Sequence, residues 1–200
     1  MADTLKVMIV RHGEKPTVKH QAPYGVTKDG TQDWESLTVR GWVRAGGLVP
    51  LFGADGGPAR DGLATPTLIY VSKPGDPASV ADAEEGSKSK RPCQTVTPLT
   101  ARLGKAPNLD FGRGDEVELV KQVLQQKGCV LIAWQHEAIC VIAQGIVAAN
   151  PPEGGLPTKW PGDRFDLVWV FDQPAEGGQS WRFTQIPQLL LPGDSATVIT

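Results

Sequence analysis

The sequence has no apolar run that approaches the roughly 20 residues needed to cross a bilayer. Its N-terminus, MADTLKVMIV, lacks the basic start and long apolar stretch of a signal peptide. Cysteines are few and odd in number, Cys93, Cys129 and Cys140, with no Cys-x-x-Cys spacing. These features predict a soluble, cytoplasmic protein whose thiols are free and buried in a reducing compartment.

An excess of charge of one sign is also missing. The chain has 20 Lys and Arg against 22 Asp and Glu, a formal net charge of -2. This balance gives no general attraction to nucleic acid or anionic membranes, so we expect neither as a partner. No cluster of His, Cys and Asp has the spacing of metal ligands, and we expect no metal and no cofactor.

A length of 200 residues suits a single domain over 1–200, and a hydrophobic content of 40% allows a sizeable core. The polar stretch 73–90 is expected to be a mobile insertion, either a substrate lid or a tolerated surface loop.

Apolar runs and helix signals alternate along the chain. Strands are predicted at 5–10, 68–71 and 129–134, and two that can pair antiparallel at 166–171 and 181–186. Helices are predicted at 38–52, 91–104, 115–127 and 138–149. The first has Thr38 as N-cap and Val43 on its apolar face. The third has Asp115 as cap, with Val117 and Leu124 on its apolar face. This alternation predicts an α/β fold, a three-layer α/β/α sandwich around a mostly parallel sheet.

Two buried strands end on polar clusters, Arg11-His12-Gly13 and Gln135-His136-Glu137. If the strands are parallel neighbours, these clusters meet at one edge, where such sheets bind ligands. A neutral imidazole can attack phosphorus, a glycine permits a tight turn, and an arginine fork suits phosphate oxygens. The clusters therefore favour phosphoryl chemistry.

The stretch MIVRHGEKP resembles the signature of the histidine phosphatase superfamily, which has the phosphoglycerate mutase-like fold. Further pieces follow in that superfamily's order: Leu37-Thr38-Val39-Arg40-Gly41 is similar to its LTxRG, Arg91-Pro92-Cys93-Gln94-Thr95 to its RxxQT, and Val130 to Glu137 to the strand that carries its second histidine. One departure is that about fifteen extra residues separate Ser72 from Arg91, compared with the superfamily's compact SPxxR.

The resemblance implies roles by position. His12 would be the nucleophile that becomes phosphohistidine, Arg11 and Arg91 would bind the phosphoryl oxygens, and His136 would complete the pocket. Lys15, beside the motif, is expected either to reach substrate anions or to be an ordinary solvated lysine. The implied substrate is a phosphorylated small molecule or a phosphoprotein; oligomeric state is left open.

The proton donor is the least defined role. Some branches of the superfamily use an acid directly after the second histidine, here Glu137. Others place the acid after the RxxQT helix, where Asp110, Asp115 and Glu116 lie, although residues at a helix start also serve as caps. For a good leaving group, water could suffice.

Three other features have ordinary structural explanations. His20 is expected on a surface loop, and Arg164 is expected to pair with an aspartate rather than to enter the pocket. The cluster of Trp169, Phe171 and Trp181 is expected to pack in the core.

We expect a metal-independent phosphatase that hydrolyses a phosphomonoester or related compound through phosphohistidine. Two alternatives are a phosphomutase of the same superfamily, which would depend on a bisphosphate primer, and a non-catalytic module that binds a phosphorylated ligand. Turnover of an aryl phosphate that is lost in His12→Ala separates the module from the enzymes.

Overall fold

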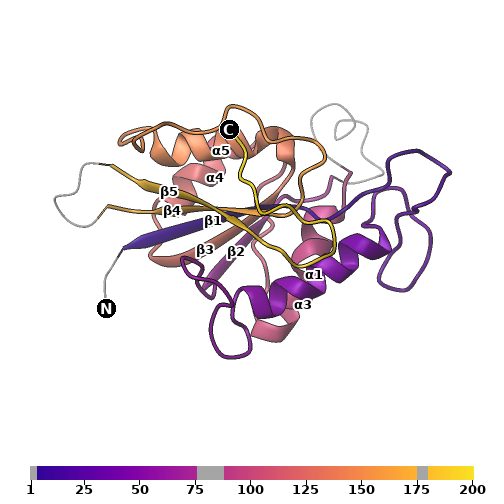
Figure 1. The fold of residues 1–200 in the computed structure, drawn as a ribbon. Helices are drawn as coiled ribbons and strands as arrows, with labels where there is room; N and C mark the ends of the chain where they lie inside the picture. The colour runs from indigo at the N-terminus through magenta and orange to yellow at the C-terminus, as the bar shows by residue number, and fades with distance from the viewer. Residues whose placement is uncertain (1–3, 76–87, 175–179) are drawn as a thin grey trace.

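The structure, a computed structural model, describes residues 4–75, 88–174 and 180–200. These residues form an α/β fold built on a mixed sheet of five strands in the order β2-β3-β1-β4-β5 (Figure 1). The strands are β1 (Leu5–Arg11), β2 (Leu68–Val71), β3 (Gly128–Trp134), β4 (Leu167–Asp172) and β5 (Arg182–Pro187). The helices are α1 (Val39–Leu51), α3 (Arg91–Leu103), α4 (Glu116–Val123) and α5 (His136–Val147).

The prediction of a mostly parallel sheet is only partly confirmed. β1 and β2 each run parallel to β3, but β4 is antiparallel to β1, and β5 is antiparallel to β4. After α5 the chain returns through residues 148–166 to the edge where β1 ends, since the carbonyls of Gly162 and Arg164 bind the Arg11 side chain there. β4 therefore starts at that edge and must run opposite to β1. The predicted antiparallel pairing of the last two strands is confirmed.

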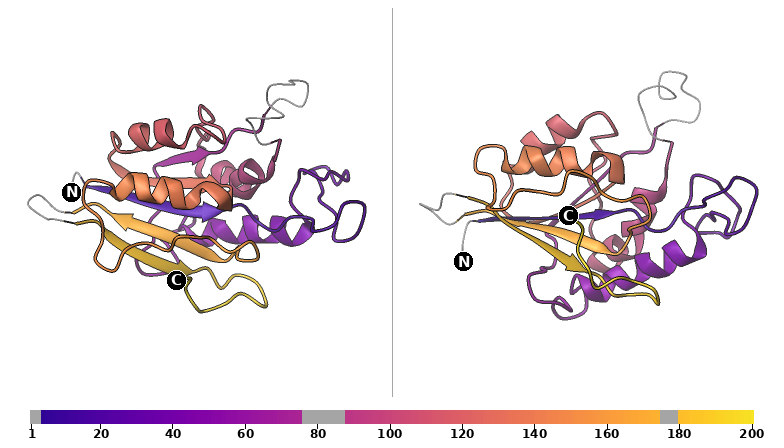
Figure 2. Two further views of the ribbon diagram at one scale, coloured as in Figure 1. Left: turned by 90° about the horizontal axis from the view of Figure 1, so that it is seen from above. Right: turned by 45° about the horizontal axis from the view of Figure 1, so that its top comes forward.

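The three-layer arrangement is confirmed. One hydrophobic cluster joins the sheet to α4 and α5, and a second joins the opposite face to α1 and α3. Both Figure 1 and the right-hand view of Figure 2 show the two helix pairs on opposite sides of the sheet. The predicted aromatic cluster lies in the first core, where Trp169, Phe171 and Trp181 are at most 5% exposed.

Helix α1 begins as predicted but faces the sheet differently. The Thr38 hydroxyl accepts a hydrogen bond from the Gly41 N–H at 3.2 Å and caps the helix. Val43, however, is 55% exposed, and the expectation that it lies on the apolar face is wrong. The buried face follows the helical period through Ala45, Leu48 and Leu51, which leaves position 43 outside it.

Helix α4 is shorter than the predicted 115–127. Its buried face consists of Glu116, Leu119, Val120 and Val123. Val117 is 57% exposed and Leu124 is 37% exposed, so their predicted places on the apolar face are wrong. The Asp115 side chain makes no capping bond within the helix, because its Oδ2 accepts from the Gly112 N–H at 2.8 Å.

Cys93, Cys129 and Cys140 are free; the last two are buried and Cys93 is half-buried. Most of the predicted mobile insertion at 73–90 falls on residues 76–87, which lie outside the described residues, so its mobility stays a prediction. Within the three described ranges, no helix is both long and apolar enough to span a membrane.

Candidate active site

The carboxyl ends of β1 and β3 meet at one edge of the sheet, as the sequence predicted. Arg11 pairs with Trp134 in the parallel register, and the His12 N–H donates to the Trp134 carbonyl at 3.2 Å. α5 begins at His136, two residues beyond the end of β3. Both histidines thus follow adjacent strand ends, and the segment between β1 and α1 extends past this edge (Figure 1).

The His12 side chain is buried and neutral. Its exposed fraction is 3%, and its Nδ1 lies 2.7 Å from the Gly13 carbonyl, which can only accept a proton. Nδ1 therefore donates, and the lone pair of the neutral ring is on Nε2. Burial, followed by the charge of Arg11, lowers the pKa of His12 to about 3. An uncharged ring with its lone pair on Nε2 is the form required of a nucleophile.

The turn after His12 is held by close backbone packing. The Gly13 N–H donates to Oγ1 of Thr95 at 2.8 Å. A Cβ at position 13 would lie 3.0 Å from the Gly41 carbonyl oxygen, and a Cβ at position 41 would lie 2.6 Å from that of Glu14. The glycines of the two sequence motifs therefore let the turn pack directly against the start of α1.

Arg11 is completely buried and only partly satisfied. Its NH1 donates to the carbonyls of Pro161, Gly162 and Arg164 at 3.1, 2.8 and 2.9 Å, and the Phe165 ring centroid lies 3.8 Å from its Cζ. Its Nε and NH2 have no hydrogen-bond partner among the residues that the structure describes. Burial lowers its pKa to about 10, which leaves it charged at neutral pH. Buried cationic donors without a partner in the described part of the chain are groups that an anion could satisfy.

Arg91 lies at the start of α3 and is engaged by the protein itself. Its Nε donates to the Ser36 carbonyl at 3.3 Å, its NH2 to the Trp34 carbonyl, and its NH1 to Oγ of Ser89 at 3.3 Å. Glu35 lies 3.5 Å from NH2. The charge of Arg91 still contributes to the lowered pKa of His12, which places it near the imidazole.

Lys15 and His136 border the same region. Burial lowers the pKa of Lys15, and the charges of Arg11 and Arg91 add to that effect. The His136 side chain is 16% exposed, and its Nε2 would lie 3.6 Å from a Cβ at position 162. His136 therefore packs against the loop that Arg11 binds, and the predicted residues Arg11, His12, Lys15, Arg91 and His136 gather at one edge.

Glu137 lies beside His136 and is ionised. Its Oε2 is 2.9 Å from the His136 Nδ1, an ion-pair distance without regular hydrogen-bond geometry, and its side chain is 48% exposed. The neighbouring imidazole is the largest influence that lowers the pKa of the carboxyl, to about 2. A proton donor must carry a proton, so this carboxylate could donate only if bound substrate raised its pKa.

The other candidate donors have structural partners. Oε1 of Glu116 accepts from Nε1 of Trp134 at 3.0 Å, and both of its carboxylate oxygens accept from the Gly114 N–H. Asp110 is exposed, and its Oδ2 accepts from the Asn108 side chain at 2.7 Å. These hydrogen bonds give both carboxylates a structural role, in the loop that follows α3 and at the start of α4.

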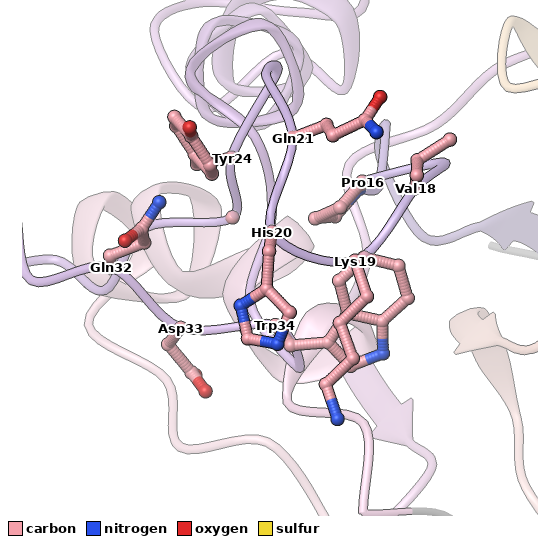
Figure 3. A pocket seen from close by; sticks show the side chains of 10 residues that line it. Pro16, Val18, Lys19, His20, Gln21, Tyr24, Gln32, Asp33 and Trp34 are labelled. Atoms are coloured by element: carbon pink, nitrogen blue, oxygen red, sulfur yellow. The ribbon is translucent and has the colours of Figure 1, made fainter.

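The expectations for His20 and Arg164 fit the structure. His20 is exposed on the loop after β1, where it lines a pocket of about 170 Å³ (Figure 3). Neither His12 nor Arg91 lines that pocket. The Arg164 Nε donates to Oδ1 of Asp166 at 2.8 Å, which is the predicted pair.

Several residues shape this edge of the sheet although no sequence pattern gives them a role. Thr95 and Gln94 belong to the RxxQT-like motif, which gives them no role of their own; Oε1 of Gln94 accepts from the Leu37 N–H at 2.7 Å and so connects α3 with the segment that leads into α1. Phe165 carried no signal, although its ring lies over Arg11 and 6.1 Å from that of His12. Only the folded chain brings the loop before β4 to this edge.

Together, a buried imidazole and a buried guanidinium with donors unsatisfied among the described residues lie side by side where two parallel strands of the α/β fold end. Neither the scan against models of known protein families nor the search of curated proteins produced a match. Among solved structures, the chain is similar to the protein histidine phosphatase SixA complexed with tungstate, with a TM-score of 0.52 and 13% identity over 92% of this chain and 97% of that one. The chain therefore has the histidine phosphatase, phosphoglycerate mutase-like fold.

Proposed function

We propose that the protein is a histidine phosphatase that hydrolyses a phosphomonoester or related phosphorylated compound without a metal ion. The observation that carries this proposal is the pairing of the neutral His12 imidazole with the two unpartnered donors of Arg11. An unsatisfied buried guanidinium costs stability, and a tetrahedral oxyanion supplies the acceptors that it lacks. The structural neighbour was solved with tungstate, which is such an oxyanion.

In the first step, Nε2 of His12 attacks phosphorus while the bond to the leaving oxygen breaks. Nδ1 keeps its proton and its bond to the Gly13 carbonyl, which stabilises the positive ring as phosphohistidine forms. Nε and NH2 of Arg11 bind equatorial phosphoryl oxygens, and the charges of Lys15 and Arg91 add to the positive field. The first N–H groups of α5, which starts at His136, point to the same edge.

In the second step, water attacks phosphohistidine and releases phosphate, which restores neutral His12. Glu137 is proposed to protonate the leaving group in the first step and to accept a proton from water in the second. A bound phosphoryl dianion would raise the pKa of this carboxyl, which is about 2 without it, because like charges oppose ionisation.

Hydrolysis of p-nitrophenyl phosphate in excess EDTA tests the proposal, with His12→Ala as the test variant and His20→Ala as its matched control. His20 is a histidine on the same loop that is exposed and does not line the proposed anion site. We expect turnover in the wild type and in His20→Ala, and none in His12→Ala. A wild type that binds tungstate but hydrolyses no member of a panel of phosphorylated metabolites would instead be a binding module.

A further inference from the structure

A second cavity opens beside the anion site. Its volume is about 650 Å³, within the range of pockets that hold small organic molecules. It lies between the loop after β1, the start of α1 and the loop before β4. Its walls are formed by Glu14, Lys15, Thr17, Ala22, Pro23, Tyr24, Val26, Thr38, Val39, Arg40, Gly162, Asp163 and Phe165.

The cavity adjoins the proposed phosphate site through shared neighbours, although neither His12 nor Arg11 lines it. Phe165 lines it and has its ring centroid 3.8 Å from Cζ of Arg11, and Lys15 lines it and interacts electrostatically with Arg11. Gly162, which lines it as well, gives its carbonyl to Arg11 and lies next to Nε2 of His136. A molecule whose phosphoryl group contacts Arg11 would therefore extend its organic part into this cavity.

Most of the wall surface is carbon, although Thr17, Tyr24, Lys15 and Asp163 also line the cavity. Ala22, Pro23, Val26 and Val39 contribute apolar surface, and Val39 is 65% exposed at the first position of α1. Among the charged wall residues, Glu14 is already paired.

Glu14 is held by two arginines, at 3.1 Å from Nε of Arg40 and 2.8 Å from NH2 of Arg44. Its carboxylate is thus neutralised and oriented before any ligand arrives. A sugar or nucleotide would place hydroxyl groups against mostly apolar walls, where they would lose hydrogen bonds with water.

We infer that this cavity binds the leaving group of the substrate, and that the substrate is a small phosphorylated compound with an aromatic or branched apolar group. This inference rests on the proposed function and narrows it. Because one or two aromatic rings would be buried, the affinity for such a compound should exceed that for a methyl analogue by roughly ten- to a hundred-fold.

Binding of two non-hydrolysable phosphonates tests the inference without requiring turnover. Methylphosphonate and naphthylmethylphosphonate have the same head group, so the ratio of their dissociation constants, measured by titration calorimetry, reports the cavity alone. We expect the naphthylmethyl compound to bind at least roughly ten-fold more tightly to the wild type. Equal affinities would overturn the inference.

Val39→Asn and Val43→Asn form a matched pair. Both valines are exposed on α1, but only Val39 lines the cavity. Val39→Asn should reduce the affinity ratio by roughly ten-fold, since an amide would face the aromatic ring, whereas Val43→Asn should leave it unchanged. A ratio unaffected by Val39→Asn would place the naphthyl group elsewhere.

The outcomes also separate the inference from the proposed function. Tight, Val39-dependent binding of the naphthylmethyl compound by a protein that hydrolyses no phosphomonoester would uphold the cavity assignment and reject the phosphatase. Hydrolysis that depends on His12, with equal affinities for the two phosphonates, would uphold the phosphatase and reject the cavity assignment.

Discussion

The N–H of Gly13 donates a 2.8 Å hydrogen bond to Oγ1 of Thr95, although 82 positions separate the two residues. The same hydroxyl donates to the Arg91 carbonyl at 2.7 Å. One buried side chain therefore connects the turn that orients His12 with the first turn of α3, where the second arginine lies. The imidazole and that arginine are positioned by a shared contact.

Thr95→Val should impair both stability and catalysis. It preserves shape but leaves the buried Gly13 N–H without an acceptor, which costs about 1–3 kcal/mol of unfolding free energy. Because His12 follows the position of this turn, kcat for an aryl phosphate should fall as well. Urea unfolding and steady-state kinetics measure the two effects. Thr95→Ser keeps the hydroxyl and should recover most of both; equal losses in the two variants would contradict this role.

Burial of neutral His12 should make the fold sensitive to acid. Its pKa is about 3 in the folded protein against an ordinary value of 6.5, so between these values the unfolded chain binds one more proton than the folded one. His12 thus contributes stability that is fully present above pH 6.5 and is lost as the pH falls below it, about 2 kcal/mol between pH 7 and pH 5.

Urea unfolding at pH 7 and pH 5 measures this loss. His12→Asn should lose less stability between the two pH values than the wild type, whereas His20→Asn, at an exposed position, should lose as much as the wild type. Parallel pH dependence in the wild type and His12→Asn would show that the histidine titrates normally in the folded protein.

The sequence patterns predicted the strands well because buried strands here are short continuous apolar runs. β1 extends the predicted 5–10 by one residue, and β2 matches 68–71. The direction of β4 was not predictable in this way, since an apolar run reads the same in both directions. Direction depends on where the chain returns to the sheet, and here contacts between Arg11 and the loop at 161–164 mark that place.

The position of a site residue was predictable from the sequence only where that residue belongs to a motif at the end of a strand or the start of a helix. His12, Arg11 and His136 stand at the carboxyl edge by strand register alone. The state of each group depends on partners far along the chain: the three carbonyls that occupy NH1 of Arg11 are 150 to 153 positions away. Such contacts leave no local pattern in the sequence.

Arg11→Lys should weaken oxyanion binding although it keeps the charge. A lysine lacks the planar pair of donors that Nε and NH2 form. Its single ammonium group would bind the three carbonyls that NH1 binds now, so these carbonyls would compete with the oxyanion for it. Half-inhibition of p-nitrophenyl phosphate hydrolysis in this variant should require at least roughly ten-fold more tungstate than in the wild type. Arg182→Lys, in an exposed pair with Asp172, is the control and should change nothing; normal inhibition of Arg11→Lys would show that charge alone suffices.

Asp194→Asn should destabilise the fold through Arg44. The Asp194 side chain is 3% exposed and lies 2.7 Å from NH2 of Arg44, which is 2% exposed. Loss of one partner of a buried pair costs about 3 kcal/mol. Asp55→Asn, which removes an exposed pair with Arg102, should cost less than about 1 kcal/mol. Similar unfolding free energies for the two variants would contradict the importance of burial.

The same aspartate should contribute to acid unfolding in a second, lower range of pH. Burial on its own raises the pKa of Asp194, but hydrogen bonds from Arg44 outweigh it and the pKa is lowered. Its stabilisation is therefore present above the ordinary value of 3.8 and is lost as the pH falls through the lower folded value.

Glu137→Gln tests the proton donor through the basicity of the leaving group. A donor matters most when the leaving oxygen is basic, so the variant should slow phenyl phosphate by roughly a hundred-fold but p-nitrophenyl phosphate by much less. The carboxylate also places a negative charge beside His136, and loss of that negative charge alone would affect both esters equally. A plot of kcat/KM against leaving-group pKa distinguishes these effects, because only loss of a donor steepens its slope. An unchanged slope would exclude Glu137 as the donor.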